Sequence, residues 1–245
     1  MYYSRKLAIY NLTVFDMGNH KGTCYIWNET IAKRGANEIS SCIWQYIATK
    51  VELGTKEFRF YSDNCGGQNR NQILFSMYVK AAMDFQIKIT HRYLETGHTQ
   101  NDGDSMHARI EIHCKNRSIY TQEEWCNLIR EAKVTEPHYT VHELQQPEVF
   151  DFSKLSEKKK WTKLKISQLR EINVNEKGEV HYKHGYHEEL RTVSMGTANS
   201  QNTELKRAYR YKLQLDSNKK KDLQSLLDKG LIPPHCRDFY EKILS

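Results

Sequence analysis

Three aspartates stand where the predicted elements could gather them into a metal site. Asp16 follows the β-forming stretch "LTVF", Asp63 follows "EFRFYS", and Asp104 lies in the first turn of the helical stretch "GDSMHARIE". In an open α/β sheet the carboxyl ends of parallel strands share one edge, so adjacent first and fourth strands would place Asp16 beside Asp63. The incoming helix could then bring Asp104 to the same edge.

Such a cluster of carboxylates is costly unless a cation neutralises it. Mg²⁺ and Mn²⁺ suit ligand sets made entirely of oxygen. Two such ions can activate water and stabilise the leaving oxygen in phosphodiester chemistry. The three aspartates therefore predict a site for one or two divalent ions.

The segment "NCGGQNRN" after Asp63 combines glycines with amide side chains. Glycine lets the backbone come close to a ligand or a neighbouring strand, and amides are neutral donors that could hold phosphate or orient Asp63. The alternative is an ordinary Asx turn followed by a helix cap. The predicted nucleic-acid contacts in this segment are Asn64, Gly66, Gly67, Gln68, Asn69 and Asn71.

The elements that must position these residues alternate between strand and helix. Strands are predicted at 12–16, 23–27, 57–63 and 86–95, and a short edge strand would also fit 28–35. Helices are predicted at 38–51, 72–85, 103–115 and 122–133, the first capped by Asn37 and the last by a Thr121–Glu124 capping box. This alternation predicts an α/β domain with a mixed sheet.

The positive charge lies in the last part of the chain. Residues 1–150 hold as many basic as acidic side chains, so the whole net charge of +7 comes from residues 151–245. We therefore predict a neutral domain over 1–150 and a basic, mainly helical C-terminal extension over 151–245, closing in two short helices around Pro233 and Pro234. Within it, "KKKW" (Lys158, Lys159, Lys160 and Trp161) suits backbone binding and base stacking, although a solvated helix with one buried tryptophan fits equally well.

Several protein classes are disfavoured. The mean hydropathy is −0.78, no stretch approaches the ~20 apolar residues of a membrane span, and the start has no secretory hydrophobic run. We therefore expect a nuclear or cytoplasmic protein that is neither secreted nor a membrane protein. Walker, Rossmann and G-x-S-x-G patterns are absent, and Cys114, Cys126, His138 and His142 lack the C-x-x-C pair that would favour zinc.

The order of elements and the three carboxylates resemble the ribonuclease H-like fold of DDE/DDD transposases, integrases and nucleases. More specifically, "VFDMGNHKGTCYIWNET", "YSDNCGGQNRN" and "GHTQNDGDSMHARIE" resemble a transposon-derived domain family of insects and other invertebrates. The similarity runs from about Leu12 to "IPPHCRDFYEKIL". It implies a mixed sheet flanked by helices and a metal-dependent DNA nuclease or transposase.

Residue by residue, the resemblance implies that Asp16, Asp63 and Asp104 are catalytic metal ligands. Asp102 is the alternative third ligand because of the "NDGD" spacing. The resemblance also brings in Glu111 as a further carboxylate two turns along the helix, His107 as a proton shuttle, and His98 as a partner for a bound carboxylate or phosphate.

The sequence is compatible with two kinds of nucleic-acid partner and with two functions. The same metal chemistry would serve DNA or RNA, and a homo-oligomer is compatible with the sequence. The rival function is a domesticated, catalytically silent module that keeps the fold and binds nucleic acid or protein.

Overall fold

The computed structural model describes residues 4–95, 101–157, 161, 164–193 and 203–245. It is a mixed α/β structure whose strands form two sheets rather than the single sheet expected from the sequence. The chain folds into two compact units, each assembled from separated stretches. The first unit comprises Met1–Arg34, Gln100–Gln146 and Tyr209–Ser245, and the second comprises Gly35–Thr99 and Pro147–Ala208. The position predicted for the domain boundary, between residues 150 and 151, falls inside the second unit.

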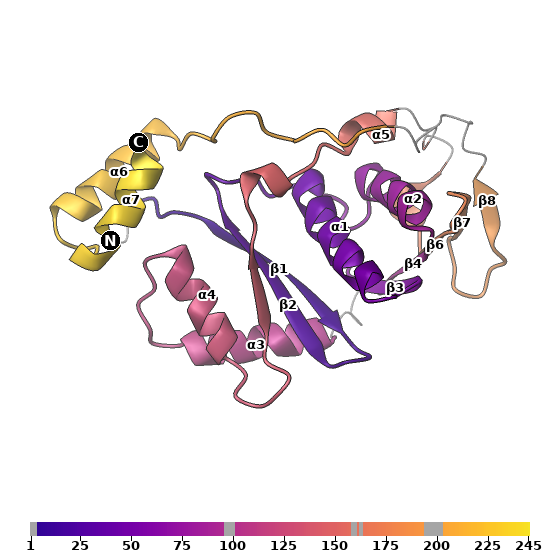
Figure 1. The fold of residues 1–245 in the computed structure, drawn as a ribbon, viewed down its shortest axis with the longest axis horizontal. Helices are drawn as coiled ribbons and strands as arrows, with labels where there is room; N and C mark the ends of the chain where they lie inside the picture. The colour runs from indigo at the N-terminus through magenta and orange to yellow at the C-terminus, as the bar shows by residue number, and fades with distance from the viewer. Residues whose placement is uncertain (1–3, 96–100, 158–160, 162–163, 194–202) are drawn as a thin grey trace. The chain divides into compact units, whose positions relative to one another are not determined.

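The first unit holds a three-stranded sheet of order β1-β2-β5, with β1 and β2 antiparallel and β5 parallel to β2. Helices α3 and α4 lie along this sheet, and α6 and α7 pack on each other (Figure 1). The elements are β1 (Ile9–Asp16), β2 (Lys21–Asn28), α3 (Asp102–Cys114), α4 (Gln122–Glu131), β5 (Thr140–Glu143), α6 (Ser217–Asp228), the 3₁₀ turn η4 (Pro234–Cys236) and α7 (Arg237–Leu244). A further 3₁₀ turn, η1 (Gln146–Glu148), follows β5.

A glycine allows α3 to pack closely on the β1–β2 hairpin. Gly22 pairs with Phe15, the residue before Asp16. A Cβ atom added at Gly22 would lie 2.3 Å from the sulfur of Met106 and 3.0 Å from the ring of Tyr139. Met106 is fully buried in the core that joins α3 to the sheet. The first turns of α3 therefore lie against the end of the hairpin that carries Asp16.

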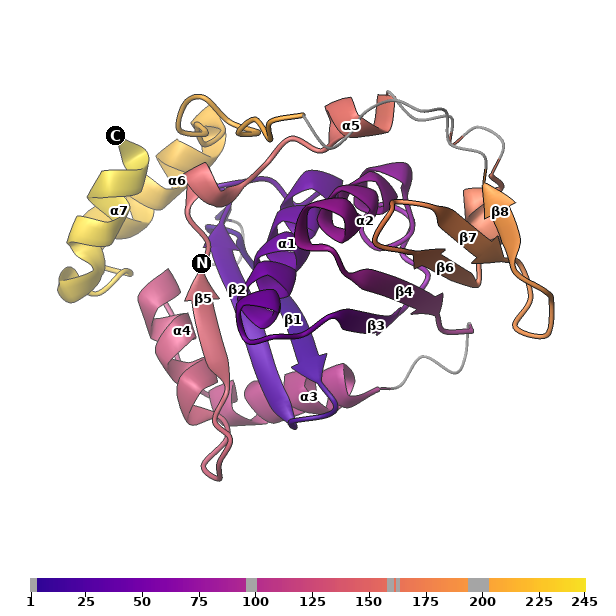
Figure 2. The ribbon, with the colours of Figure 1, turned by 45° about the vertical axis from the view of Figure 1, so that its right-hand side comes forward.

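The second unit holds a five-stranded sheet of order β3-β4-β6-β7-β8, in which β3 and β4 are parallel and the other pairs antiparallel. Helices α1 and α2 lie side by side, and α2 packs on β4 and β6 (Figure 2). The elements are α1 (Ala36–Glu52), β3 (Glu57–Ser62), α2 (Gln72–Phe85), β4 (Lys88–Tyr93), α5 (Ser153–Glu157), the 3₁₀ turn η3 (Ile166–Gln168), β6 (Glu171–Val174), β7 (Val180–Lys183) and β8 (Arg191–Val193).

Two local predictions are wrong. Residues 29–35 form turns instead of an edge strand, because the side-chain oxygen of Asn28 accepts bonds from the Thr30 N–H (3.0 Å) and hydroxyl (2.6 Å). Helix α1 is capped by Gly35 rather than by Asn37. The Asn37 oxygen instead accepts the N–H of Phe152 at 2.9 Å, which ties α1 to the chain before α5.

The C-terminal part of the chain also contains strands that the sequence did not predict. Strands β6, β7 and β8 lie between residues 171 and 193, so the description of this part as mainly helical is incomplete. These strands are three or four residues long, and β6 and β7 are joined by a tight turn in which Gly178 has a φ of 77°. Pairing on the neighbouring strand stabilises them, and such long-range pairing leaves little trace in local sequence.

No helix among the described residues is long and apolar enough to span a bilayer.

Candidate functional site

Asp16 ends β1 and organises the hairpin turn. Its Oδ1 atom accepts the backbone N–H groups of Gly18 (3.0 Å) and Asn19 (3.2 Å), and its Oδ2 atom accepts the Asn19 amide (3.0 Å). The carboxylate is half-buried. Asp16 therefore has a turn-forming role whether or not it also binds an ion.

Asp104 lies at the start of α3 and forms a capping box. Its Oδ2 atom accepts the Asn101 N–H at 2.9 Å, while the Asn101 side chain accepts the N–H groups of Gly103 and Asp104. Asp102 and Glu111 are exposed on the same helix, and His107 is half-buried. The predicted acidic residues of α3, Asp102, Asp104 and Glu111, are thus exposed to solvent. The helix that carries them packs on the hairpin that contains Asp16.

Asp63 is exposed in the loop between β3 and α2, in the second unit. Its Oδ1 atom accepts the Cys65 N–H (3.2 Å) and the Asn69 amide (2.7 Å), which is an Asx turn. A Cβ atom added at Gly67 would meet nothing within 4 Å, and one added at Gly66 would only reach the Arg70 carbonyl at 4.0 Å. Packing within the chain therefore does not require glycine at either position, and open space lies beside the loop.

The amide side chains of this loop mostly bond to the loop itself. Asn64 donates to the Leu94 carbonyl at 2.6 Å and accepts from Arg70 at 3.2 Å. Asn71 is the N-cap of α2: its oxygen accepts the Leu74 N–H at 2.9 Å, and its amide donates to the Gln68 carbonyl at 3.0 Å. These bonds explain Asn64, Asn69 and Asn71 without a ligand, so the prediction that they contact nucleic acid remains a prediction.

Substitutions at Asn71 can distinguish its role as a helix cap from a role in binding nucleic acid. Asn71→Ala should lower the free energy of unfolding by about 1 kcal/mol, because the Leu74 N–H loses its acceptor. Asn71→Asp should be more stable than Asn71→Ala, because aspartate keeps the cap and its charge suits a helix N-terminus, although it loses the bond from the amide to the Gln68 carbonyl. Urea denaturation measures both. Unchanged stability in Asn71→Ala would contradict the capping role, and weaker oligonucleotide binding by Asn71→Asp alone would indicate a phosphate contact.

A buried network behind Asp63 was not predicted from the sequence. His91 on β4 is 3% exposed, with Nδ1 2.9 Å from the Tyr78 hydroxyl and Nε2 2.9 Å from the Ser62 hydroxyl. The Ser62 hydroxyl donates to the Asp63 carbonyl at 2.9 Å, so Ser62 accepts from Nε2–H and Nδ1 accepts from Tyr78. Burial lowers the pKa of His91 from 6.5 to about 3, which keeps the ring neutral. The available signal was a histidine on the inward face of β4, at a spacing of two residues from both Ile89 and Tyr93.

A pocket opens at the ends of β3 and β4, beside the Asp63 loop. Leu94 lines it and is held by both Ser62 and Asn64 through its backbone. Inside, Arg92 pairs with Glu171 (Nε–Oε2 2.6 Å) and donates to the hydroxyl of Tyr61 at 3.1 Å. The remaining lining residues are Glu95, Lys183 and Tyr186.

The Arg92–Glu171 pair is held in its charged form. Hydrogen bonds to Glu171 and Tyr61 raise the pKa of Arg92. Burial favours the neutral form of Glu171, but hydrogen bonds from Asn173 and Arg92 outweigh it and lower the pKa of its carboxyl. The pocket therefore presents a fixed guanidinium next to Tyr61, an aromatic ring that is 48% exposed.

The predicted stacking role of Trp161 is wrong in this structure. Its side chain is 1% exposed, its indole N–H donates to the Ser76 hydroxyl at 2.9 Å, and its ring packs on Phe75 with centroids 5.6 Å apart. A buried indole cannot stack on a base. Lys158, Lys159, Lys160 and His98 lie outside the described residues.

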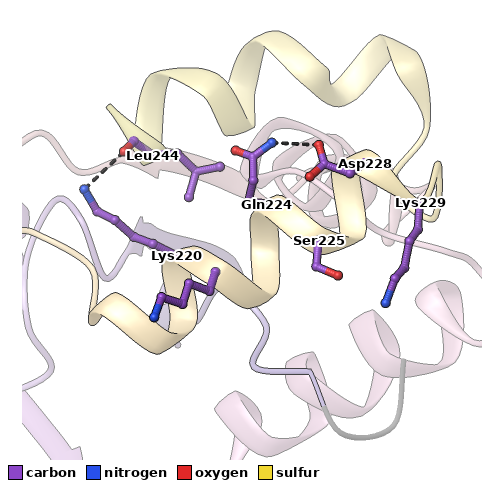
Figure 3. Close-up of a pocket in the computed structure, with 7 residues that line it drawn as sticks. Lys220, Gln224, Ser225, Asp228, Lys229 and Leu244 are labelled. Carbon is purple, nitrogen blue, oxygen red and sulfur yellow. Dashed lines mark hydrogen bonds between the residues drawn. The ribbon is translucent and has the colours of Figure 1, made fainter.

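Two lysines of α6 form hydrogen bonds within the first unit, and one of them pairs with a carboxylate. Lys219 pairs with both oxygens of Glu29 (2.7 and 2.8 Å), and Lys220 donates to the Leu244 carbonyl at 3.1 Å. A shallow groove runs along α6 beside Lys220, where Gln224 and Asp228 bond to each other (Figure 3). Lys219 and Lys220 therefore help to hold the first unit together.

The fold and the site together define a mixed α/β protein with aspartates at the ends of its elements and a pocket carrying an arginine and a tyrosine. The sequence over residues 4–189 matches the family described as Domain of unknown function (DUF7869), and the chain belongs to that family. No curated protein and no solved structure matches the chain.

Proposed function

We propose that this chain is a ribonuclease H-like, transposase-derived domain that cleaves or joins DNA phosphodiester bonds with Mg²⁺ or Mn²⁺. The observation that carries the proposal is the setting of Asp63. Its carboxylate is exposed at the carboxyl end of the parallel pair β3–β4, next to the pocket that contains Arg92 and Tyr61. Carboxyl ends of parallel strands are where α/β sheets place their sites.

The aspartates fit a hard divalent ion. In the described part of the chain, Asp63 accepts hydrogen bonds through Oδ1 and Asp104 accepts one through Oδ2, and both residues are exposed. Mg²⁺ typically binds through one or two carboxylates and keeps several waters, so exposed oxygens of this kind suit it. Asp63 would be a ligand in the second unit, and Asp16 and Asp104, with Asp102 as the alternative to Asp104, would be ligands in the first. Strands β1 and β3 belong to different sheets, so the strand adjacency predicted to place Asp16 beside Asp63 is wrong. A bound ion would supply an activated water or hydroxyl nucleophile.

The pocket residues have roles that match a nucleic-acid substrate. The Arg92 side chain, which ends in a guanidinium, is 41% exposed, and Tyr61 offers a ring face for a base. The His91 network fixes the backbone of Ser62 and Asp63, so the carboxylate of Asp63 projects from a rigid strand end.

A second function is favoured by the hydrogen bonds of the same aspartates. Asp16, Asp63 and Asp104 each serve a turn or a cap, which accounts for them without catalysis. A domesticated, catalytically silent domain that binds nucleic acid or protein would keep these residues for the fold alone.

Asp63→Asn separates the two functions, because asparagine keeps the Asx-turn oxygen and removes the charge. With Mg²⁺ or Mn²⁺, cleavage of plasmid and strand transfer of a labelled duplex should fall by more than about 100-fold, since even residues that only support metal ligands cost 10–100-fold. Asp228→Asn, an exposed aspartate on α6, is the matched control and should retain full activity. Equal DNA binding by wild type and Asp63→Asn with no cleavage by either would establish the silent domain instead.

A further inference from the structure

A second group of metal-ligand types lies in the first unit, away from the aspartates already described. It joins Glu124 at the start of α4 to His235 and Cys236 in the turn η4. The Glu124 Oε1 atom lies 3.3 Å from His235 Nε2 and 3.7 Å from Cys236 Sγ, and all three ligand atoms lie within 4.8 Å of one another. Among the residues that the structure describes, these are the three His, Cys, Asp or Glu side chains whose ligand atoms all lie within 4.8 Å of one another.

These separations match a tetrahedral zinc site. With Zn–O and Zn–N bonds of about 2.0 Å and a Zn–S bond of about 2.3 Å, tetrahedral geometry puts the oxygen about 3.3 Å from the nitrogen and about 3.5 Å from the sulfur. The two separations from Glu124 are 3.3 and 3.7 Å. The third separation, between His235 Nε2 and Cys236 Sγ, is within 4.8 Å, and the exposed His235 side chain can move to complete the tetrahedron.

The group is organised before any ion binds. The second oxygen of Glu124 accepts the N–H groups of Tyr120 (2.7 Å) and Thr121 (3.2 Å), which directs Oε1 at His235 and Cys236. Such outer hydrogen bonds commonly orient carboxylate ligands of metals.

The turn that carries the other two ligands is also fixed. Cys236 is 1% exposed and belongs to the core of α6 and α7, and its N–H donates to the Pro233 carbonyl at 3.0 Å. The Tyr240 hydroxyl donates to the Tyr120 carbonyl at 2.6 Å, which holds α7 beside the residues that precede α4.

The donor set identifies the ion. Mg²⁺ and Ca²⁺ require oxygen ligands, whereas a thiolate, an imidazole and a carboxylate together suit Zn²⁺. We propose that Glu124, His235 and Cys236 bind one Zn²⁺ ion, with a water in the fourth position on the side where His235 is exposed.

The ion would cross-link α4 to the turn η4 between the C-terminal helices α6 and α7. Glu124 lies within the family match over residues 4–189, whereas His235 and Cys236 lie beyond it. The site thus joins a residue of the matched region to two residues that follow it, and it does not depend on the proposed nuclease activity.

The test uses the full chain, stripped with a chelator and titrated with Zn²⁺ in a calorimeter. Wild type should bind one equivalent, and His235→Gln should bind at least about 100-fold more weakly. Cys236→Ser should lose the thiolate-to-metal charge-transfer band that wild type shows with Co²⁺. Zn²⁺ should also raise the melting temperature of wild type, because it binds the folded state.

Two variants distinguish the loss of a zinc ligand from unfolding of the protein. The His235 side chain is 70% exposed, so His235→Gln should melt like wild type in chelator. Glu124→Gln keeps the capping box, which accepts glutamine at this position, yet it removes the charged ligand and should weaken zinc binding as well. His187→Gln, an exposed histidine elsewhere, is the control and should bind like wild type. Zinc binding by His235→Gln and Glu124→Gln that equals this control, or no binding by wild type, would overturn the site.

Discussion

Trp161→Ala should lower the free energy of unfolding by about 3–5 kcal/mol, the usual loss when a large buried aromatic side chain is removed. The indole is 1% exposed, packs on Phe75 and donates to Ser76 at 2.9 Å. Its removal leaves a cavity between α2 and the segment after α5, together with a buried hydroxyl that has lost a partner. Urea denaturation followed by circular dichroism measures the loss without relying on the deleted fluorophore.

Two further substitutions complete this experiment. Trp161→Phe should keep an aromatic ring in the core but lose the bond to Ser76 and part of the buried volume, so it should cost less than Trp161→Ala. Tyr211→Ala removes an aromatic ring that is 83% exposed and should change stability by less than about 0.5 kcal/mol. If Trp161→Ala were as stable as Tyr211→Ala while losing oligonucleotide affinity, the indole would be a base-stacking residue after all.

The sequence predicted the local elements of this protein well. Apolar residues at helical spacing in α1 and α2, and the β-forming stretches of β1 to β4, act over a few neighbours and can be recognised without a structure. The predicted capping box of Thr121 and Glu124 was confirmed, and it too depends only on residues close in sequence. A mixed α/β protein followed from their alternation.

Features that depend on residues distant in sequence were not predictable. The partition of the strands into two sheets, and the short strands β6 to β8, depend on pairing between segments far apart in the chain. Glu124 and His235 are separated by 111 positions, so no local spacing could reveal their proximity. Trp161 was ambiguous because an aromatic residue among lysines fits either a buried or a binding role.

The aspartates show a different limit of sequence reasoning. A carboxylate at a strand end or a helix start is favoured both by turn and cap chemistry and by metal binding. Asp63 and Asp104 form the turn and cap bonds that the first explanation requires. Since both explanations predict the same residue at the same position, only a charge-removing substitution that preserves the hydrogen bonds can distinguish them.

Mild acid should destabilise the protein through His91. Its folded pKa of about 3 lies below the ordinary value of 6.5, so between these values the unfolded chain binds a proton that the folded chain excludes. The contribution of this neutral histidine to stability is complete above pH 6.5 and declines by about 1.4 kcal/mol per pH unit below it. From pH 7 to pH 5 the wild type should therefore lose about 2 kcal/mol through His91 alone.

His91→Gln isolates this effect, because glutamine does not titrate. The variant should be less stable at pH 7, since Tyr78 and Ser62 lose well-placed partners, but its loss between pH 7 and pH 5 should be about 2 kcal/mol smaller than that of wild type. His187→Gln, at an exposed position, should follow the wild-type pH dependence. Urea denaturation at pH 7, 6 and 5 provides the comparison. Equal pH dependence in His91→Gln and wild type would mean that the ring is protonated or solvated in the folded protein, and the rigid support inferred for the Asp63 loop would then be wrong.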